Sequence, residues 1–169
     1  MPQEPRICLW LLPQPVDVLR QLICELAQTH GTPQFAPHLT LLGGLRMPRL
    51  ALADTAARLA ATSPPLTLEP LSINGEPDRF RCLYVRLALT GGLARIRHRA
   101  ETLMRQPGTA FLPHLSLYYG NMNVTERTRL AQELMIRLPA TITVDRLALV
   151  DTSGEVEDWN EVAAFALSS

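Results

Sequence analysis

The chain has 169 residues, of which 47% are hydrophobic and 19% are charged, and its 16 basic residues balance its 16 acidic residues. This composition excludes an intrinsically disordered chain, and a net charge of zero argues against a protein that binds long nucleic acid through many phosphates. The apolar runs are too short to span a bilayer. We therefore expect a soluble monomer that acts on a small anionic ligand, without a membrane partner.

The three cysteines, Cys8, Cys24 and Cys82, form no closely spaced pair of the kind that binds metals, and an odd number is a poor basis for a disulfide framework. A reducing compartment is the simplest interpretation. The first apolar run, Ile7 to Leu12, is too short before Pro13 to be the core of a signal peptide. We therefore expect the protein to lie in the cytoplasm.

The first half of the chain predicts the order strand, helix, strand, helix, strand. The evidence is hydrophobic periodicity, together with glycines that end helices and prolines that cannot donate to a strand ladder. We predict a strand at Ile7–Leu12 ended by Pro13 and Pro15, a helix at about Val16–Thr29 ended by Gly31, a strand at His38–Leu42 ended by Gly43 and Gly44, a helix at Leu50–Ala61, and a strand at Leu66–Ile73 before an Asn74-Gly75 turn.

The second half predicts the same order, followed by one more strand. Asn123 is a suitable helix cap because Glu126 follows three residues later, as in a capping box. We predict a strand at Cys82–Leu89, a helix at Leu93–Met104, a strand at His114–Tyr118, a helix at Val124–Leu138, a strand at Ile142–Val150 and a last strand at Val162–Leu167.

One short motif occurs in both halves. Residues 35–41 read FAPHLTL, and residues 111–117, which lie 76 positions later, read FLPHLSL. The same shift places Leu66–Ile73 on Ile142–Leu149, so the repeat extends beyond the motif. Two copies of so long a unit do not indicate a solenoid. They indicate two related lobes about an approximate twofold axis, each with three strands and two helices, and with the motif strands facing each other across a cleft.

These boundaries predict a single two-lobed domain over residues 1–169. Its internal repeats cover about residues 5–77 and 81–153, and a C-terminal strand follows them.

The histidines and hydroxyls of the two motifs are the candidate catalytic residues. Strand alternation places His38 and Thr40 on one face, and likewise His114 and Ser116, with leucines on the opposite face. The need for a hydrophobic core in each half explains the repeated leucines. It does not explain the repeated histidines, because a buried histidine needs polar partners. Two imidazoles supply a proton acceptor and a proton donor, and the hydroxyls can hydrogen-bond a phosphate. The sequence does not decide which histidine is the base.

The paired motifs and the two similar halves resemble the two-histidine (2H) phosphoesterase superfamily, and within it the cyclic phosphodiesterases of the plant and yeast type. The early Trp10 and the late Asp151-Thr152-Ser153-Gly154 with Trp159 support this resemblance. It implies an α+β fold of two pseudo-symmetric lobes, the cyclic phosphodiesterase fold, with antiparallel sheets lining a central cleft and helices outside. It also implies catalysis without a metal or other cofactor.

The same resemblance implies a substrate, a ribose cyclic phosphate. Expected reactions are nucleoside 2',3'-cyclic phosphate to the 2'-phosphate, or ADP-ribose 1'',2''-cyclic phosphate to the 1''-phosphate. The RNA-processing relatives commonly follow their first motif with an arginine and an aromatic residue, whereas Leu42-Gly43-Gly44 follows here. That difference favours a small-molecule substrate.

Two aromatic residues enter the predicted site through the resemblance alone. Trp10 and Tyr119 match aromatic residues near the nucleotide in the cyclic phosphodiesterases. Strict alternation from His114 would instead place Tyr118 on the motif face, so the match for Tyr119 requires a bulge or a strand end. The alternative is that these rings only pack in the core.

Three other functions stay open. The first is RNA-end processing, as an RNA 2',3'-cyclic phosphodiesterase or a 2'-5' RNA ligase-like protein, and the second is a non-catalytic module that binds a phosphate or an RNA end. The third is a metal hydrolase, which would need a third ligand, and neither a carboxylate nor a third histidine recurs beside both motifs. His30 and His98 have no counterpart in the other half, and we expect them to be solvated surface residues.

Overall fold

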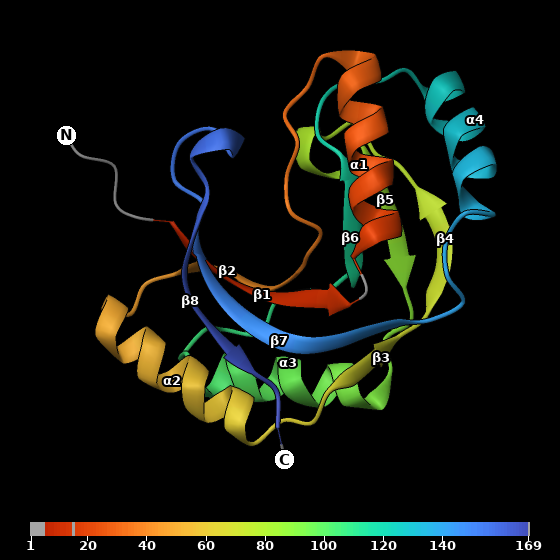
Figure 1. Cartoon of the computed structure of the whole chain (residues 1–169). Helices are drawn as coiled ribbons and strands as arrows, with labels where there is room; N and C mark the ends of the chain where they lie inside the picture. The colour runs from red at the N-terminus through yellow and green to blue at the C-terminus, as the bar shows by residue number, and fades with distance from the viewer. Residues whose placement is uncertain (1–5, 15, 169) are drawn as a thin grey trace.

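Two antiparallel sheets with helices on their outer sides make up the protein (Figure 1). Over the described residues, 6–14 and 16–168, this computed structural model contains eight strands and four α-helices. The strands are β1 (Ile7–Gln14), β2 (Leu39–Leu45), β3 (Leu66–Leu68), β4 (Pro70–Asn74), β5 (Leu83–Leu87), β6 (His114–Tyr118), β7 (Ile142–Asp151) and β8 (Asn160–Ala166). The helices are α1 (Asp17–His30), α2 (Arg49–Ala61), α3 (Gly91–Leu103) and α4 (Val124–Met135), with two short 3₁₀ helices, η1 (Arg79–Arg81) and η2 (Val156–Asp158).

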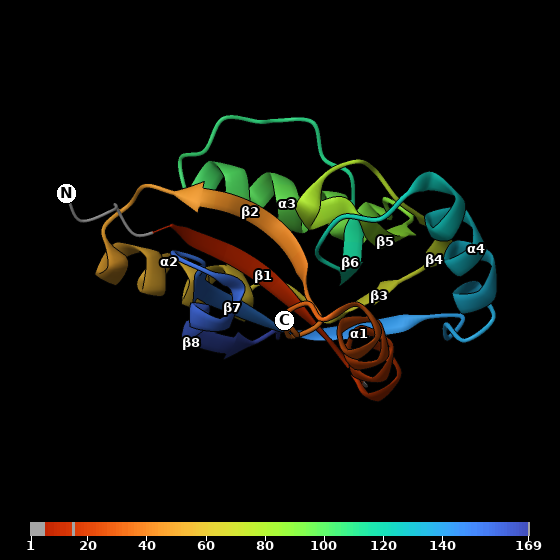
Figure 2. The same cartoon turned by 90° about the horizontal axis from the view of Figure 1, so that it is seen from above.

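The larger sheet has the strand order β2-β1-β7-β3, with β8 also paired to β7, and the smaller sheet has the order β4-β5-β6. Helices α2 and α3 pack on the larger sheet, whereas α1 and α4 pack on the smaller one. Seen from above, β2 and β8 lie on one side of the molecule and β4, β5 and β6 on the other, while β7 runs across from the side of α4 to the side of α2 (Figure 2). The predicted α+β class, with antiparallel sheets and outer helices, is confirmed.

The halves of the chain exchange their third strands. Strand β7, from the second half, pairs along β1 in the larger sheet, while β4, from the first half, pairs with β5 in the smaller sheet. The prediction that each half supplies all three strands of its own lobe is therefore wrong. The predicted single strand Leu66–Ile73 is also wrong, because the chain leaves one sheet and enters the other at Glu69, between β3 and β4.

Two predicted strand ends were too early. Strand β1 continues through Pro13 to Gln14, because its neighbour β2 pairs only as far as Leu11, so a proline beyond that point costs no hydrogen bond on that side. Pro15 lies outside the described residues. Strand β2 continues through Gly43 and Gly44 to Leu45, and Gly44 has a φ of 64°, which glycine adopts at no steric cost.

The first motif strand contains a β-bulge. Leu9 of β1 pairs with Leu42, whereas its neighbour Trp10 pairs with Thr40. Leu41 is therefore the extra residue of β2, and the side chains after it change face.

The second motif strand has a bulge at the equivalent position. Tyr84 of β5 pairs with Ser116, whereas Leu83 pairs with Tyr118. The extra residue is Leu117, 76 positions after the extra residue of β2. The repeated motif thus encodes the same irregularity twice.

The helix ends follow local signals. Gly31 ends α1 with a φ of 65°, and the side chain of Asn123 accepts a hydrogen bond from the amide of Glu126 to cap α4. Helix α4 ends at Met135 rather than at the predicted Leu138. Among the described residues, no helix is both long and apolar enough to cross a membrane.

Candidate active site

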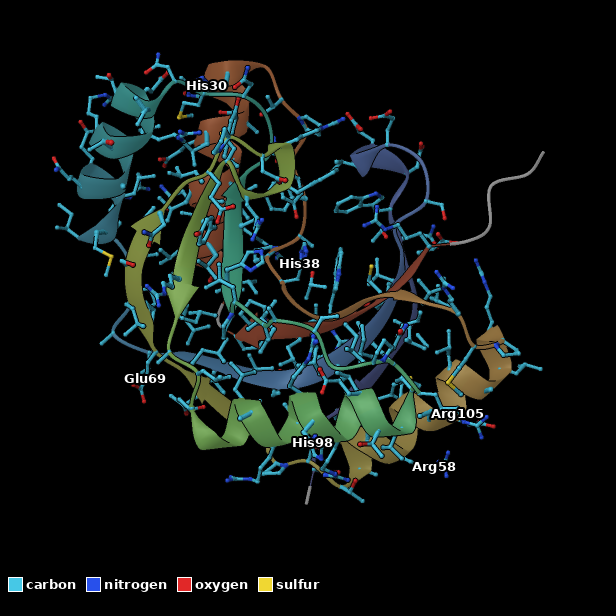
Figure 3. All side chains as sticks on the ribbon, turned by 180° about the vertical axis from the view of Figure 1, so that it is seen from behind. His30, His38, Arg58, Glu69, His98 and Arg105 are labelled. Carbon is cyan, nitrogen blue, oxygen red and sulfur yellow. The ribbon has the colours of Figure 1, made fainter. Side chains whose placement is uncertain are left out.

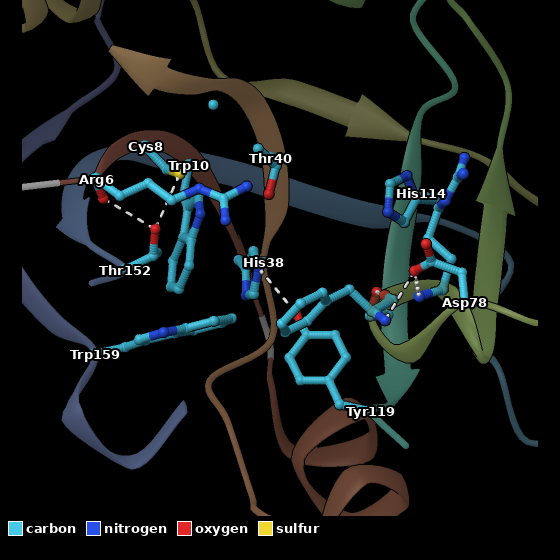
Figure 4. A pocket seen from close by; sticks show the side chains of 14 residues that line it. Arg6, Cys8, Trp10, His38, Thr40, Asp78, His114, Tyr119, Thr152 and Trp159 are labelled. Carbon is cyan, nitrogen blue, oxygen red and sulfur yellow. Dashed lines mark hydrogen bonds between the residues drawn. The ribbon is translucent and has the colours of Figure 1, made fainter. Parts of the chain in front are cut away.

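A cavity of about 330 Å³ lies between the two sheets, and every residue predicted for the site lines it. Both sheets contribute to its walls, so segments far apart in the sequence meet there. It is lined by Arg6, Cys8, Trp10, His38, Thr40, Gly43, Asp78, Phe80, Arg81, His114, Ser116, Tyr119, Thr152 and Trp159 (Figure 4). The prediction that the two motif histidines border one hollow is therefore confirmed.

The backbone orients both imidazoles in the same way. The Nδ1 atom of His38 lies 2.7 Å from the carbonyl oxygen of Ala36, and the Nδ1 atom of His114 lies 2.8 Å from that of Leu112. A carbonyl can only accept, so each Nδ1 carries the proton and each neutral ring leaves Nε2 with a free lone pair. In both motifs the acceptor stands two residues before the histidine, on the far side of a proline.

Aromatic rings hold His38 in place. Its imidazole stacks on Trp10 with the ring centroids 3.5 Å apart and the planes 8° from parallel. The hydroxyl of Tyr119 lies 3.5 Å from Nε2 of His38, at the long limit of a hydrogen bond. Burial lowers the pKa of His38 to about 4, although the bond to the Ala36 carbonyl opposes this shift. His38 is therefore neutral near pH 7.

The surroundings of His114 are more polar. Its ring meets Tyr84 edge to face at 5.3 Å, and the Tyr84 hydroxyl donates to Glu76 at 3.0 Å. Glu76 also pairs with Arg81 at 3.0 Å. Burial lowers the pKa of His114, the bond to the Leu112 carbonyl opposes this, and the charge of Arg81 lowers it while that of Glu76 raises it.

The motif hydroxyls line the cavity beside the histidines. Thr40 is half-buried on β2. Ser116 is buried, and its hydroxyl donates to the carbonyl of Phe80 at 2.8 Å. In this state the Ser116 proton is engaged by the backbone, so Ser116 must exchange that partner before it can donate to a ligand.

The bulge in β6 decides between the two tyrosines. After Leu117, Tyr118 joins the hydrophobic core and Tyr119 lines the cavity, which confirms that the position of Tyr119 depends on a bulge. The equivalent residue in the first half is Gly43, so only one half carries a large ring there. Burial raises the pKa of the Tyr119 phenol well above its usual value, and the hydroxyl stays protonated.

Several cavity residues escaped prediction from the sequence, because the chain segments that carry them have no motif. Arg6 precedes β1, and Asp78 caps η1 by accepting from the amides of Phe80 and Arg81. For Trp159, the sequence offers only the resemblance to the family. The 3₁₀ helix and the position of these loops depend on contacts between the sheets, which strand and helix periodicity does not reveal.

The other two histidines lie away from the cavity (Figure 3). His98 is exposed on α3, as predicted. His30 is only half exposed, because it packs edge to face on Tyr118 and lies 3.7 Å from Glu126. Within the described part of the chain, no three His, Cys, Asp or Glu side chains gather in a way that could hold a metal ion.

Comparison with known families identifies the class of the protein. A model of the 2'-5' RNA ligase superfamily matches residues 8–155, and the chain belongs to this superfamily. The predicted relationship to the two-histidine phosphoesterases is therefore confirmed at the level of the superfamily.

Solved structures with the same fold include three proteins from different organisms. TT0787 of Thermus thermophilus is 18% identical, with 96% of this chain and 97% of that chain covered and a TM-score of 0.64. E. coli LigT complexed with 3'-AMP is 17% identical, with 98% and 99% covered and a TM-score of 0.59. Usb1 of Kluyveromyces marxianus is 14% identical, with 97% and 98% covered and a TM-score of 0.51. A comparison with curated protein sequences gives no match.

Proposed function

We propose that this protein hydrolyses a ribose cyclic phosphate without a metal, with His38 and His114 as general base and general acid. The observation that carries the proposal is the matched pair of imidazoles on one cavity, each held in the Nδ1–H form by a backbone carbonyl. Each Nε2 is then the unprotonated ring atom for proton transfer, and Nε2 of His38 gives up its long contact with the Tyr119 hydroxyl when it accepts a proton from water. A well-placed transfer of this kind contributes typically about 10²–10⁴-fold to the rate.

The different surroundings of the two histidines support a different role for each. A general base must be neutral, and burial lowers the pKa of His38 to about 4, so His38 is neutral near pH 7. A general acid must carry a proton, and His114 is the less buried ring; Glu76 favours its charged form, although the charge of Arg81 opposes this more strongly. In this proposal Nε2 of His38 takes a proton from the attacking water, and Nε2 of His114 protonates the departing ribose oxygen.

The hydroxyls act on the non-bridging phosphate oxygens. Thr40 and Ser116 stand two residues after the histidines in the two strands that line the cavity, so they are placed to hold the phosphorus in line. Ser116 gives up its bond to the Phe80 carbonyl when it does so. We therefore expect Ser116→Ala to slow the reaction less than either histidine variant.

A small substrate fits the cavity better than a long one. Its volume of about 330 Å³ suits a nucleotide-sized ligand, and the chain has no net positive charge for a long nucleic acid. We propose nucleoside 2',3'-cyclic phosphates and ADP-ribose 1'',2''-cyclic phosphate as substrates. The second candidate is the 2',3'-cyclic end of an RNA, which the name of the superfamily favours.

Phosphorus NMR of the reaction products tests the proposal directly. The purified protein is incubated with each cyclic phosphate and with a short RNA that ends in a 2',3'-cyclic phosphate, with and without excess chelator. We expect a 2'-phosphate or 1''-phosphate monoester in both conditions, and loss of the product signal in His38→Ala and His114→Ala. No turnover of any cyclic phosphate by the folded protein would refute hydrolysis, and loss of activity in chelator would refute a metal-free reaction.

A further inference from the structure

A buried arginine on α3 lies close to both motifs, although it is not among the residues that line the cavity. Arg97 is only 9% exposed, and arginine is seldom buried unless it is paired. Helix α3 lies beside β2, which carries the first motif and forms an edge of the larger sheet (Figure 2). Residues 104–113 then connect α3 to β6, the second motif strand. Arg97 is therefore placed to contact segments of both motifs.

The guanidinium of Arg97 makes these contacts directly. One terminal nitrogen donates to the carbonyl oxygen of Leu41, the bulge residue of β2. The other terminal nitrogen donates to the hydroxyl of Thr109 at 3.1 Å. The guanidinium also lies over the ring of Phe111, the first residue of the second motif, with its carbon 4.8 Å from the ring centre. A single planar group thus joins the first motif strand to the segment that leads into the second.

Glu101 fixes the orientation of the guanidinium. Its carboxylate lies one helical turn after Arg97 on α3 and accepts a hydrogen bond from Nε at 2.6 Å. The N–H groups of a guanidinium lie in one plane at fixed angles, so acceptors at Leu41, Thr109 and Glu101 hold it in one position. The segment after α3 has a second bond to β2, because the side-chain amide of Gln106 donates to the carbonyl of Gly44 at 3.1 Å.

The other half of the chain lacks this arginine. The residue 76 positions before Arg97 is Gln21, which is exposed on α1 and donates to Glu25 at 2.9 Å. Helix α1 packs on β6 as α3 packs on β2, so a helix of this fold can cover a motif strand without a buried charge. A buried ion pair can often be replaced by apolar side chains without loss of stability. Packing alone therefore does not account for Arg97.

We propose that Arg97 is a positioning residue that sets the separation of the imidazoles of His38 and His114. The Leu41 carbonyl lies three residues after His38, and the Phe111 ring lies three residues before His114. This inference rests on the proposed hydrolysis, because two proton transfers at one phosphate require both Nε2 atoms at defined positions. A displacement of about 1 Å in such a site can cost on the order of 100-fold in rate.

Two variants of Arg97 test the proposal through the hydrolysis of adenosine 2',3'-cyclic phosphate. Arg97→Met keeps the apolar stem and removes the hydrogen bonds of the guanidinium. Arg97→Lys keeps a positive charge beside Glu101 but cannot reproduce the planar fork. We expect kcat to fall by roughly 10–100-fold in both variants, because both lose the fork. KM should change by less than about threefold, since Arg97 does not line the cavity.

Arg99 supplies a matched control on the same helix. Its guanidinium donates to the carbonyl and the hydroxyl of Thr62 and to the hydroxyl of Ser63. These bonds join α3 to the end of α2 and do not involve either motif. Arg99→Met should therefore lower the free energy of unfolding in urea and leave kcat within about twofold of the wild-type value.

Thr109→Val tests the contact on the side of the second motif. This substitution removes the hydroxyl that accepts from Arg97 and keeps the shape of the side chain. We expect a smaller fall in kcat than in Arg97→Met, and little further fall when the two substitutions are combined, because they remove the same interaction. Fully additive effects would show that Thr109 acts independently of Arg97 and would contradict the shared role.

Hydrogen exchange of the backbone amides gives a measurement that does not depend on turnover. In Arg97→Met and Arg97→Lys we expect faster exchange in residues 39–45 and 104–113, which belong to the first motif strand and to the segment before the second. Arg99→Met should leave exchange in these two segments unchanged. Unchanged exchange in the Arg97 variants, or an equal increase in Arg99→Met, would refute the proposal.

The outcomes distinguish the role of Arg97 from the hydrolysis itself. If the wild-type protein cleaves no cyclic phosphate, the proposed function fails, and hydrogen exchange alone decides whether Arg97 holds the two motifs. If the wild-type protein is active and the folded Arg97 variants keep kcat within about twofold, hydrolysis stands and the positioning role is refuted. Full activity in Arg97→Lys would also refute it, since the charge and not the fork would then matter. If Arg97→Met does not fold, Arg97→Lys decides the result.

Discussion

The buried position of His38 predicts a measurable dependence of stability on pH. The pKa of His38 falls from 6.5 to about 4 in the folded protein, so the unfolded chain binds this proton more tightly than the folded protein does. The free energy of unfolding is therefore unaffected well above pH 6.5 and decreases as the pH falls from 6.5 toward 4. For one group with these two pKa values, the loss between pH 7 and pH 5 is about 2 kcal/mol.

The perturbation that isolates this effect is His38→Gln. The variant is less stable at every pH because it loses the stack on Trp10, but it has no imidazole to protonate at this position. Urea denaturation at pH 7 and pH 5 gives the change in unfolding free energy for each protein. We expect the wild-type protein to lose about 2 kcal/mol more than His38→Gln over this interval, because the other titrating groups are common to both.

A control variant completes the experiment. His98→Gln removes an exposed histidine outside the cavity, and its pH dependence should follow that of the wild-type protein. If His38→Gln loses as much stability as the wild-type protein between pH 7 and pH 5, His38 is not buried in its neutral form. The assignment of His38 as a general base that stays neutral would then lose its physical support.

The site and the glycines give three further predictions. A cyclic substrate whose leaving oxygen is replaced by sulphur should restore activity to His114→Ala but not to His38→Ala, because a thiolate leaves without being protonated. Equal rescue of the two variants would contradict the proposed roles of the histidines. The pH profile of kcat/KM should be bell-shaped with its maximum below pH ~6.5, because the pKa values of both His38 and His114 are lowered in the free protein, and a maximum above pH 7 would contradict this. Gly75→Ala should destabilise the protein by roughly 1–3 kcal/mol in urea denaturation, because a Cβ there would overlap the carbonyl oxygen of Cys82. Gly43→Ala, whose Cβ would meet only the Cys8 sulphur at 3.8 Å, should be nearly neutral.

The sequence predicted the elements that carry the site because their signals are local. The alternation around His38 and His114 places the leucines in the core, where Leu39 and Leu115 are almost fully buried, and the histidines in the cavity. The carbonyl that holds each Nδ1 is only two residues away, so the motif itself specifies the orientation of the ring.

The features that could not be predicted depend on pairing between distant segments. The exchange of β4 and β7 between the sheets depends on which strands pair with each other, and hydrophobic periodicity predicts a strand but not the strand it pairs with. The bulges at Leu41 and Leu117 add one residue to a strand whose alternation looks regular, so Tyr119 reaches the cavity where simple alternation indicates Tyr118. Phe80 lies in a connection between strands, and the residues that it contacts there come from distant parts of the chain, which the sequence does not indicate.

The strand exchange has a consequence for any ancestor of half the length. A single unit would possess two strands of one sheet and one strand destined for another, so it would expose an unpaired edge in both. Two copies that swapped this third strand would satisfy both edges and, in the same step, bring two identical histidines to one hollow. A fused chain also lets the two halves differ, since Tyr119 lines the cavity in one half and Gly43 stands at the equivalent position in the other.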